Sequence, residues 1–168
     1  MQSRLKAPLD AVVFDCDSTL SHLEGVDYLA QLNKVQDTVV ELTADAMTKT
    51  GICPEIYEQR LNLIRPQQNQ LQILADVYFE QVMPDVQQTI SILQQLHKPV
   101  FIVSAGILQA VVGFANQLGI AADHVFAVNV FFDATGNYKD FDRQSPLINN
   151  NGKAVVVSDL LQKYARIG

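Results

Sequence analysis

A short apolar strand that runs directly into two acidic residues constrains this chain more than any other feature. Residues 11–20 read Ala-Val-Val-Phe-Asp-Cys-Asp-Ser-Thr-Leu, and residues 9–14 are expected to form a buried strand that ends at the acidic loop. Side chains two positions apart on an extended backbone point to the same face. Asp15 and Asp17 should therefore converge where the strand ends, which is where open α/β sheets bind ligands.

The acidic pair is interpreted as catalytic, because two carboxylates this close repel each other unless other charges compensate. Asp15 is the expected nucleophile, which attacks phosphorus and forms an aspartyl-phosphate. Asp17 is the expected acid that protonates the departing oxygen and then the base that activates water. A hard cation, expected to be Mg²⁺, would be held by Asp15 and Asp17. The alternative is an acidic cluster that caps a helix.

Composition excludes several functional classes. The 168 residues fit one domain, or a core with a modest insertion. The net charge is −6 and no cluster of Lys and Arg occurs, so no nucleic-acid partner is expected. No apolar run is long enough for a signal peptide or a membrane span, so a cytoplasmic protein without a membrane partner is expected. Cys16 and Cys53 are expected to be reduced thiols, and a homodimer is left open.

A long helical insertion follows the acidic pair. Apolar residues between positions 22 and 83 recur with helical spacing, prolines at 54, 66 and 84 interrupt the pattern, and no strand pattern occurs. The expected organisation is a helical cap over residues 22–83, inserted between two segments of one α/β core, residues 1–21 and 84–168.

Strand and helix patterns alternate after the insertion. A helix is followed by a strand over residues 99–103, a turn at 104–106 and a second helix that ends before Gly119. Residues 125–132 read as a strand, and a turn at 135–137 leads into a β-hairpin. A final helix is expected over 155–164. This order predicts the α/β class, with a Rossmann-like, mostly parallel sheet, an inserted helical cap and a β-hairpin.

Two polar residues outside the acidic pair could bind a phosphate. Ser104 follows a strand and precedes a helix, so its hydroxyl and the nearby N–H groups could hold phosphate oxygens; the alternative is a helix N-cap. Lys153 follows Asn-Asn-Asn-Gly and could offer its ammonium to the same group; the alternative is an exposed surface lysine. Glu24 and Arg60 are, by themselves, ordinary charges on helix surfaces.

The order of these signals resembles the haloacid dehalogenase superfamily of phosphohydrolases, and within it the phosphoserine phosphatase family. The resemblance extends through most of the chain. It implies a haloacid dehalogenase-like core and a Mg²⁺-dependent phosphomonoesterase with Asp15 and Asp17 as the catalytic residues. It also implies that the backbone carbonyl of Asp17 meets Mg²⁺, and that Ser104, Ala105 and Lys153 bind the phosphoryl group.

The same resemblance implies a substrate site in the cap. Glu24 would face the ammonium group of O-phospho-L-serine, Arg60 its carboxylate, and Met47 would line the site. A guanidinium fits a carboxylate with two parallel hydrogen bonds, which agrees with the role of Arg60. Two alternatives stay open: a phosphatase of another small phosphorylated metabolite, and a catalytically silent module that binds a phosphorylated ligand or a protein.

The sequence departs from the family pattern in two segments. Residues 48–54 stand where the family has a glycine-rich turn. The last family motif, a strand that ends in Gly-Asp-Gly and provides a metal carboxylate, would begin just beyond Gly168. The 168 residues are therefore expected to be part of a longer protein, with feeble or absent turnover by themselves and normal turnover in the extended form. The strand at 11–14 is expected to be an exposed apolar edge, because the missing strand would lie beside it.

Overall fold

The computed structural model describes residues 9–49, 53–164 and 167–168, and of residues 45–49 only the backbone. The α-helices are α1 (Gly25–Leu32), α2 (Gln36–Lys49), α3 (Pro54–Ile64), α4 (Gln68–Glu80), α5 (Val86–Gln95), α6 (Leu108–Gln117) and α7 (Gly152–Lys163). The strands are β1 (Val12–Phe14), β2 (Val100–Ile107), β3 (Val125–Val128), β4 (Val130–Phe132) and β5 (Tyr138–Phe141). Short 3₁₀ turns occupy Ala122–His124 and Pro146–Ile148.

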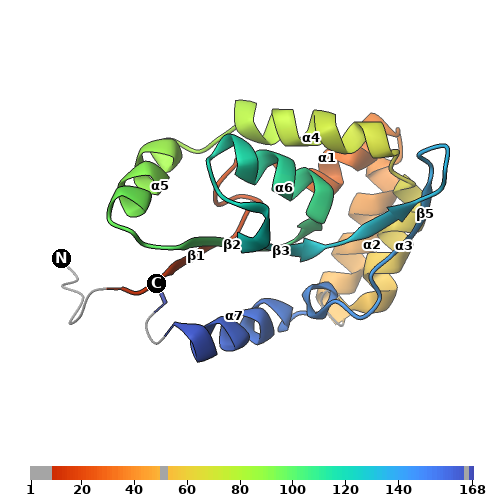
Figure 1. Cartoon of the computed structure of the whole chain (residues 1–168). Coiled ribbons are helices and arrows are strands. Elements are labelled where there is room, and N and C mark those ends of the chain that lie inside the picture. The colour runs from red at the N-terminus through yellow and green to blue at the C-terminus, as the bar shows by residue number, and fades with distance from the viewer. Residues whose placement is uncertain (1–8, 50–52, 165–166) are drawn as a thin grey trace.

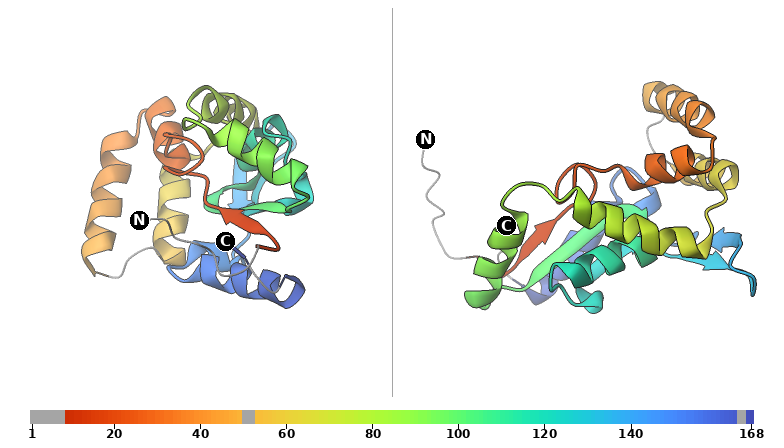
Figure 2. Two further views of the ribbon diagram at one scale, coloured as in Figure 1. Left: turned by 90° about the vertical axis from the view of Figure 1, so that its left-hand side faces the viewer. Right: turned by 90° about the horizontal axis from the view of Figure 1, so that it is seen from above.

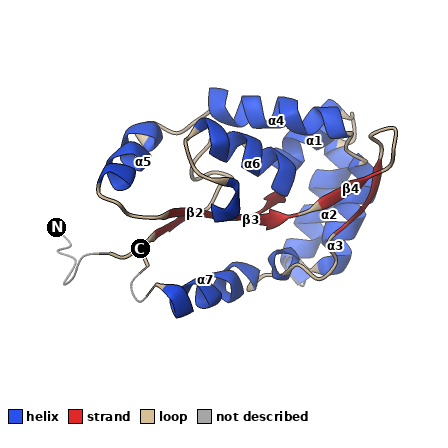
Figure 3. Ribbon diagram, viewed as in Figure 1, coloured by secondary structure: helices blue, strands red, loops and turns tan. Residues whose placement is uncertain are grey.

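A parallel sheet forms the centre of the molecule. Its strand order is β1-β2-β3, with Val12 opposite Val100 and Ile102 opposite Val125. Helices α4 and α6 lie on one side of the sheet and α7 lies on the other (Figures 1 and 3). Strand β2 is buried along almost its whole length, as expected for a parallel strand covered on both faces. The predicted α/β class with a mostly parallel sheet is confirmed.

Local signals in the sequence mark where the helices begin and end. Pro54 is the first residue of α3, a position where its missing N–H costs nothing. At the start of α4 the side chain of Gln70 accepts a hydrogen bond from the N–H of Gln67, at 2.9 Å. Gly119 follows α6 with φ +73°, the left-handed conformation that glycine adopts readily. The helical pattern predicted between residues 22 and 83 is thus confirmed for the described residues.

The two ends of the helical insertion are joined to each other. The N–H of Met83 donates to the carbonyl of Leu20, and the N–H of His22 donates to the carbonyl of Gln81, both at 2.9 Å. The Ser21 hydroxyl donates to the same Gln81 carbonyl at 3.1 Å. The chain therefore leaves the core and returns to it at one place, next to the acidic loop.

Helix α4 packs closely on α6, a helix of the segment after the insertion. A Cβ on Gly113 would lie 2.7 Å from the Cβ of Ala75, so the two helices approach too closely for any larger residue. Next to this contact, the rings of Tyr78 and Phe114 stack at 5.5 Å. Helix α4 is thus held against the sheet layer, whereas α2 and α3 contact each other.

The structure corrects the predicted turn at residues 104–106. Strand β2 continues through this segment to Ile107, but its register with β3 shifts between Val103 and Ile107. The shift lets Ser104, Ala105 and Gly106 bulge out of the regular ladder while the backbone stays extended. Sequence periodicity detects apolar alternation and does not register such a bulge.

The structure also divides the strand predicted at 125–132. Val128 ends β3 beside β2, and Val130 begins β4, which pairs with β5. Asn129 lies between them, where its carbonyl accepts from the N–H of Asp142 at 2.8 Å and its side-chain oxygen accepts from Gln109 at 3.0 Å. One apolar run therefore contributes to two sheets.

The β4–β5 hairpin extends beyond the parallel sheet towards α3 (Figure 2). Arg143 donates to Glu58 of α3 at 2.6 Å. The rings of Tyr57 and Phe141 lie 5.3 Å apart. The predicted hairpin is confirmed, and it connects the sheet segment to the helices of the insertion.

The free side of β1 is partly covered by the last residues of the chain. The N–H of Val13 donates to the carbonyl of Gly168 at 2.9 Å, and the N–H of Gly168 donates to Ala11 at 3.0 Å. Ala11 and Ile167 form a parallel bridge. The expectation of an exposed edge is therefore wrong for residues 11–13, because residues 167–168 pair with that edge.

The start of α7 allows no side chain at residue 152, and this generates a testable prediction. A Cβ on Gly152 would lie 1.8 Å from the backbone oxygen of Pro146. Gly152→Ala is expected to lower the free energy of unfolding by about 1–3 kcal/mol in urea titrations, because the backbone must shift. Ser158→Ala, at an exposed position of the same helix, is the matched control; equal stability of both variants would contradict the clash.

Candidate active site

Asp15 lies directly after β1 and binds donors from two parts of the chain. Its Oδ1 accepts a hydrogen bond from the N–H of Cys16 at 2.8 Å. Its Oδ2 accepts from Nζ of Lys153 at the start of α7, and the two side chains form an ion pair. The lysine therefore compensates the charge of the first carboxylate.

Asp17 is surrounded by neutral donors. Its Oδ1 accepts from the N–H of Gly25 and from the hydroxyl of Tyr78, each at 2.7 Å. Its Oδ2 accepts from the hydroxyl of Ser104 at 3.3 Å, and that hydroxyl in turn accepts from the N–H of Gly106 at 2.9 Å. Hydrogen bonds of this kind stabilise a carboxylate without placing a second ion beside it.

These groups surround one cavity of about 250 Å³. Its lining residues are Asp15, Asp17, Glu24, Val26, Arg60, Ala105, Gly106 and Lys153. Ser104 is fully buried just behind this lining. The predicted site residues whose side chains the structure describes lie in this lining or, for Ser104, directly behind it. Met47 belongs to α2, and its side chain lies outside the described residues.

Arg60 reaches the cavity from α3 with an incompletely satisfied guanidinium. Its Nη2 donates to Asp27 at 3.0 Å, while its Nε is buried and has no hydrogen-bond partner among the described residues. The side chain is only 13% exposed. A buried guanidinium nitrogen without an acceptor is costly, so this wall of the cavity suits a ligand with anionic oxygens.

Glu24 stands beside the acidic loop, where its carboxylate accepts from the hydroxyl of Ser18 at 2.5 Å. Burial raises the pKa of Glu24, and the charges of Asp17 and Asp27 raise it further. A cation bound next to Glu24 would compensate this penalty. The cavity thus presents a carboxylate and a guanidinium in addition to the groups around Asp15.

The donor set around Asp15 and Asp17 consists of carboxylate oxygens, which suit a hard divalent cation better than a soft one. Among the described residues, no three His, Cys, Asp or Glu side chains are grouped to hold a metal. Mg²⁺ commonly uses one or two carboxylates and completes its shell with water and substrate phosphate. The residues present therefore fit such an ion.

Two buried tyrosines contact the site, and the sequence reasoning missed both. The hydroxyl of Tyr57 donates to the backbone oxygen of Ala105 at 3.1 Å, and that of Tyr78 donates to Asp17. Burial raises the pKa of both tyrosines well above the usual value, so both hydroxyls remain donors. Both tyrosines occupy positions that fit the apolar spacing of α3 and α4. That spacing predicts packing in the core and does not indicate a role in the site.

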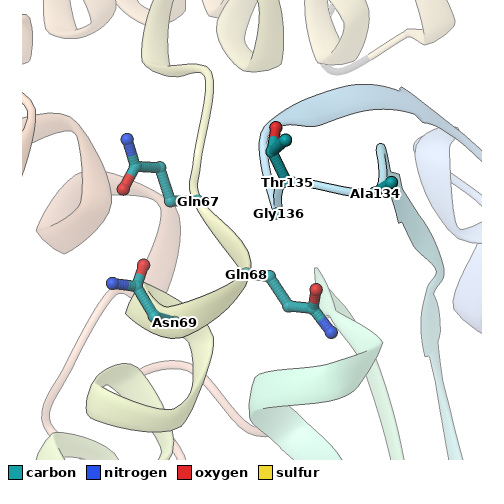
Figure 4. Close-up of a pocket in the computed structure, with 6 residues that line it drawn as sticks. All are labelled: Gln67, Gln68, Asn69, Ala134, Thr135 and Gly136. Atoms are coloured by element: carbon teal, nitrogen blue, oxygen red, sulfur yellow. The ribbon is translucent and has the colours of Figure 1, made fainter.

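A larger cavity, of about 470 Å³, lies between the start of α4 and the hairpin turn. Figure 4 shows its lining residues, and the amide groups of Gln67 and Gln68 point to opposite sides. Its polar side chains are amides and one hydroxyl, from Thr135. Without a titratable or nucleophilic group in its lining, this cavity does not compete with the acidic one as a catalytic site.

The fold and this site define a class of protein. A hydrolase of the haloacid dehalogenase family from Salmonella enterica superimposes with a TM-score of 0.76 at 18% identity, over 93% of this chain and 53% of that one. A phosphoserine phosphatase captured as a phospho-aspartyl intermediate analogue superimposes with a TM-score of 0.73 at 22% identity, over 94% and 73%. The chain has the haloacid dehalogenase fold.

Sequence comparison identifies the family within that class. The chain is 36% identical over 155 residues to the phosphoserine phosphatase of Bos taurus, which covers 92% of this chain and 69% of the relative. The chloroplastic phosphoserine phosphatase of Arabidopsis thaliana is 30% identical over 152 residues, which covers 90% and 52%. The chain belongs to the phosphoserine phosphatase family. No protein-family model matches it.

None of the helices in the described part of the chain has the length and apolar character needed to cross a bilayer.

The surroundings of the two thiols generate a second testable prediction. Cys16 is fully buried, and burial raises its pKa, with the charges of Asp17 and Asp15 acting in the same direction. Cys53 is partly exposed. We expect one thiol per chain to react with a disulfide reagent at pH 8 in the native protein, and two in guanidinium chloride, because reaction requires an accessible thiolate. Cys53→Ser should leave no rapidly reacting thiol; rapid reaction of that variant would contradict the buried position of Cys16.

Proposed function

We propose that the protein is a Mg²⁺-dependent phosphoserine phosphatase, which hydrolyses O-phospho-L-serine to serine and phosphate through an aspartyl-phosphate on Asp15. The observation that carries the proposal is the convergence of Asp15, Asp17, Ser104 and Lys153 on one cavity in a chain of this family.

In the first step, a carboxylate oxygen of Asp15 attacks phosphorus and the bond from phosphorus to the serine oxygen breaks. Asp17, protonated at this stage, gives its proton to the departing oxygen. Lys153 contacts Asp15 and is placed to stabilise the negative charge on the transferred group. The N–H groups beside Ser104 are proposed to bind the remaining phosphoryl oxygens.

In the second step, water attacks the phosphorus of the aspartyl-phosphate. Asp17, now a carboxylate, takes a proton from the water, and the bond between Asp15 and phosphorus breaks to release phosphate. The enzyme thereby returns to its starting protonation state. Asp15 and Asp17 would hold Mg²⁺, which would neutralise part of the negative charge of the carboxylates and the phosphate.

The substrate is proposed to lie with its amino-acid end towards the helices of the insertion. Arg60 would bind the carboxylate of phosphoserine, which would supply acceptors for its guanidinium. Glu24 would bind the ammonium group, and Met47 would line the same end of the site. Residues 22–83 are proposed to form a cap over the core made of residues 1–21 and 84–168.

The proposed nucleophile gives the direct test of activity. For the natural gene product, with any residues that follow Gly168, phosphate release from phosphoserine in MgCl₂ is expected to exceed that of its Asp15→Asn variant by roughly 10³-fold or more, because the amide cannot form the aspartyl-phosphate. Chelation of the metal by EDTA is expected to remove the difference, and added MgCl₂ to restore it. Equal release by the Asn variant would refute the role of Asp15; binding of phosphoserine without release would favour a silent binding module.

The proposed carboxylate contact of Arg60 gives a test of specificity. Arg60→Ala is expected to raise KM for phosphoserine by about ten-fold or more, which corresponds to the loss of a charge-assisted hydrogen bond. Phosphoethanolamine lacks the carboxylate, so its kcat/KM should change little. Arg143→Ala is a matched control, since this arginine pairs with Glu58 at the surface, away from the cavity. Equal losses on both substrates would point to another phosphorylated metabolite or to a structural role.

A further inference from the structure

Tyr78 is held rigidly in a place where it touches the proposed acid. It lies in α4, is 1% exposed, and stacks on the ring of Phe114 in α6, with an interplanar angle of 25°. The end of α4 is fastened to the loop after β1 by the hydrogen bond from the N–H of His22 to Gln81. The phenol ring therefore has little freedom to turn away from that loop.

The absence of a side chain at Gly25 makes room for the contact between Tyr78 and Asp17. A Cβ on Gly25 would lie 2.0 Å from the hydroxyl oxygen of Tyr78 and 3.4 Å from Oδ1 of Asp17. Only glycine at position 25 leaves room for the hydroxyl to reach the carboxylate. Three segments, the loop after β1, the start of α1 and the last turn of α4, thus meet at one carboxylate oxygen.

The two oxygens of Asp17 have different surroundings as a result. Oδ1 accepts two short hydrogen bonds, from Tyr78 and from the N–H of Gly25. Oδ2 has the longer contact with Ser104, at 3.3 Å, and lies 3.2 Å from where a Cβ of Gly106 would be. Gly106 lines the acidic cavity, so Oδ2 is the oxygen on the side of the reacting groups.

We propose that Tyr78 is a positioning residue, which fixes the Asp17 carboxylate so that Oδ2 is the oxygen that gives and takes the catalytic proton. The proposal rests on the proposed function, since it assigns the atom that performs the acid and base steps. The Tyr78 hydroxyl donates to Oδ1 at 2.7 Å, and Tyr78 is not among the residues that line the acidic cavity, so it acts through Asp17.

Dependence on the leaving group distinguishes positioning from a general structural role. The serine oxygen leaves as an alkoxide unless it is protonated, so kcat/KM for phosphoserine depends on a correctly placed acid. The p-nitrophenolate of p-nitrophenyl phosphate is stable without a proton. Because kcat/KM reports steps up to the first irreversible one, the later water attack, common to both substrates, does not obscure the comparison.

The test is Tyr78→Phe, which removes the hydroxyl and keeps the ring that stacks on Phe114. We expect kcat/KM for phosphoserine to fall at least about ten-fold, because Tyr78→Phe loses the hydrogen bond that stabilises the Asp17 carboxylate as it forms in the transition state. KM for phosphoserine should be nearly unchanged, and kcat/KM for p-nitrophenyl phosphate should stay within about two-fold of the wild type. Equal falls on both substrates, or no fall on phosphoserine, would overturn the proposal.

Two further variants calibrate the measurement. Asp17→Asn should lower kcat/KM far more for phosphoserine than for p-nitrophenyl phosphate, which verifies that the substrates differ in their need for an acid. Tyr138→Phe removes the hydroxyl of another tyrosine with little exposure, in β5, which does not line the acidic cavity. It should leave both substrates unchanged, and thermal unfolding should confirm that all three variants are folded.

Failure of the proposed function is recognised separately. If the natural gene product, with any residues that follow Gly168, hydrolyses neither substrate, the proposed function fails, while the contact can still be observed by proton NMR. A hydroxyl proton bound to a carboxylate gives a downfield resonance that exchanges slowly when it is buried. We expect such a resonance in the wild type, its absence from Tyr78→Phe and its displacement in Asp17→Asn. A spectrum unchanged by Tyr78→Phe would overturn the assignment of Oδ1 to Tyr78.

Discussion

The repulsion between two carboxylates at the end of β1 is the constraint on which the rest of the site depends. Asp15 and Asp17 follow a partly buried strand and are themselves partly buried, where water compensates their charge less than it would at the surface. The chain supplies the compensation from four other segments: Lys153 from α7, Ser104 from β2, the N–H of Gly25 from α1 and the Tyr78 hydroxyl from α4. The parallel sheet matters to function because it brings these segments to one edge.

The charges around the cavity are compensated to different degrees, and the uncompensated groups indicate what the site could bind. Around Asp17 every donor is neutral, whereas Asp15 faces an ammonium. At the other wall, Arg60 has a buried nitrogen without an acceptor among the described residues, and Glu24 bears a penalty for its burial. A ligand that offers an anionic end to Arg60 and a cationic group to Glu24 would relieve both. Phosphoserine, the proposed substrate, carries both a carboxylate and an ammonium group.

Sequence reasoning predicted the features that local pattern controls. Apolar spacing, prolines and glycines are signals that are local in the sequence. They predict the strand before Asp15, the helices between residues 22 and 83, the hairpin and the α/β class. The bulge at residues 104–106 and the break at Asn129 depend on register with other strands, which no local pattern contains. Sequence reasoning missed Tyr57 and Tyr78 because their aromatic rings already fit the apolar spacing of a buried helix face. Nothing in that spacing indicates that their hydroxyls have a role.

The joined ends of the helical insertion have a consequence for how such a protein can change. Backbone hydrogen bonds join Leu20 to Met83 and His22 to Gln81. The segment between these residues is therefore a loop whose two ends are held together. The entropy of closing a loop rises only slowly with its length, so a segment of another length between these ends would cost little in closure entropy, provided that it kept the close contact between α4 and α6. Because Gly25 and Tyr78 of this segment donate to Asp17, a replacement that admits a different molecule must still supply donors to that carboxylate.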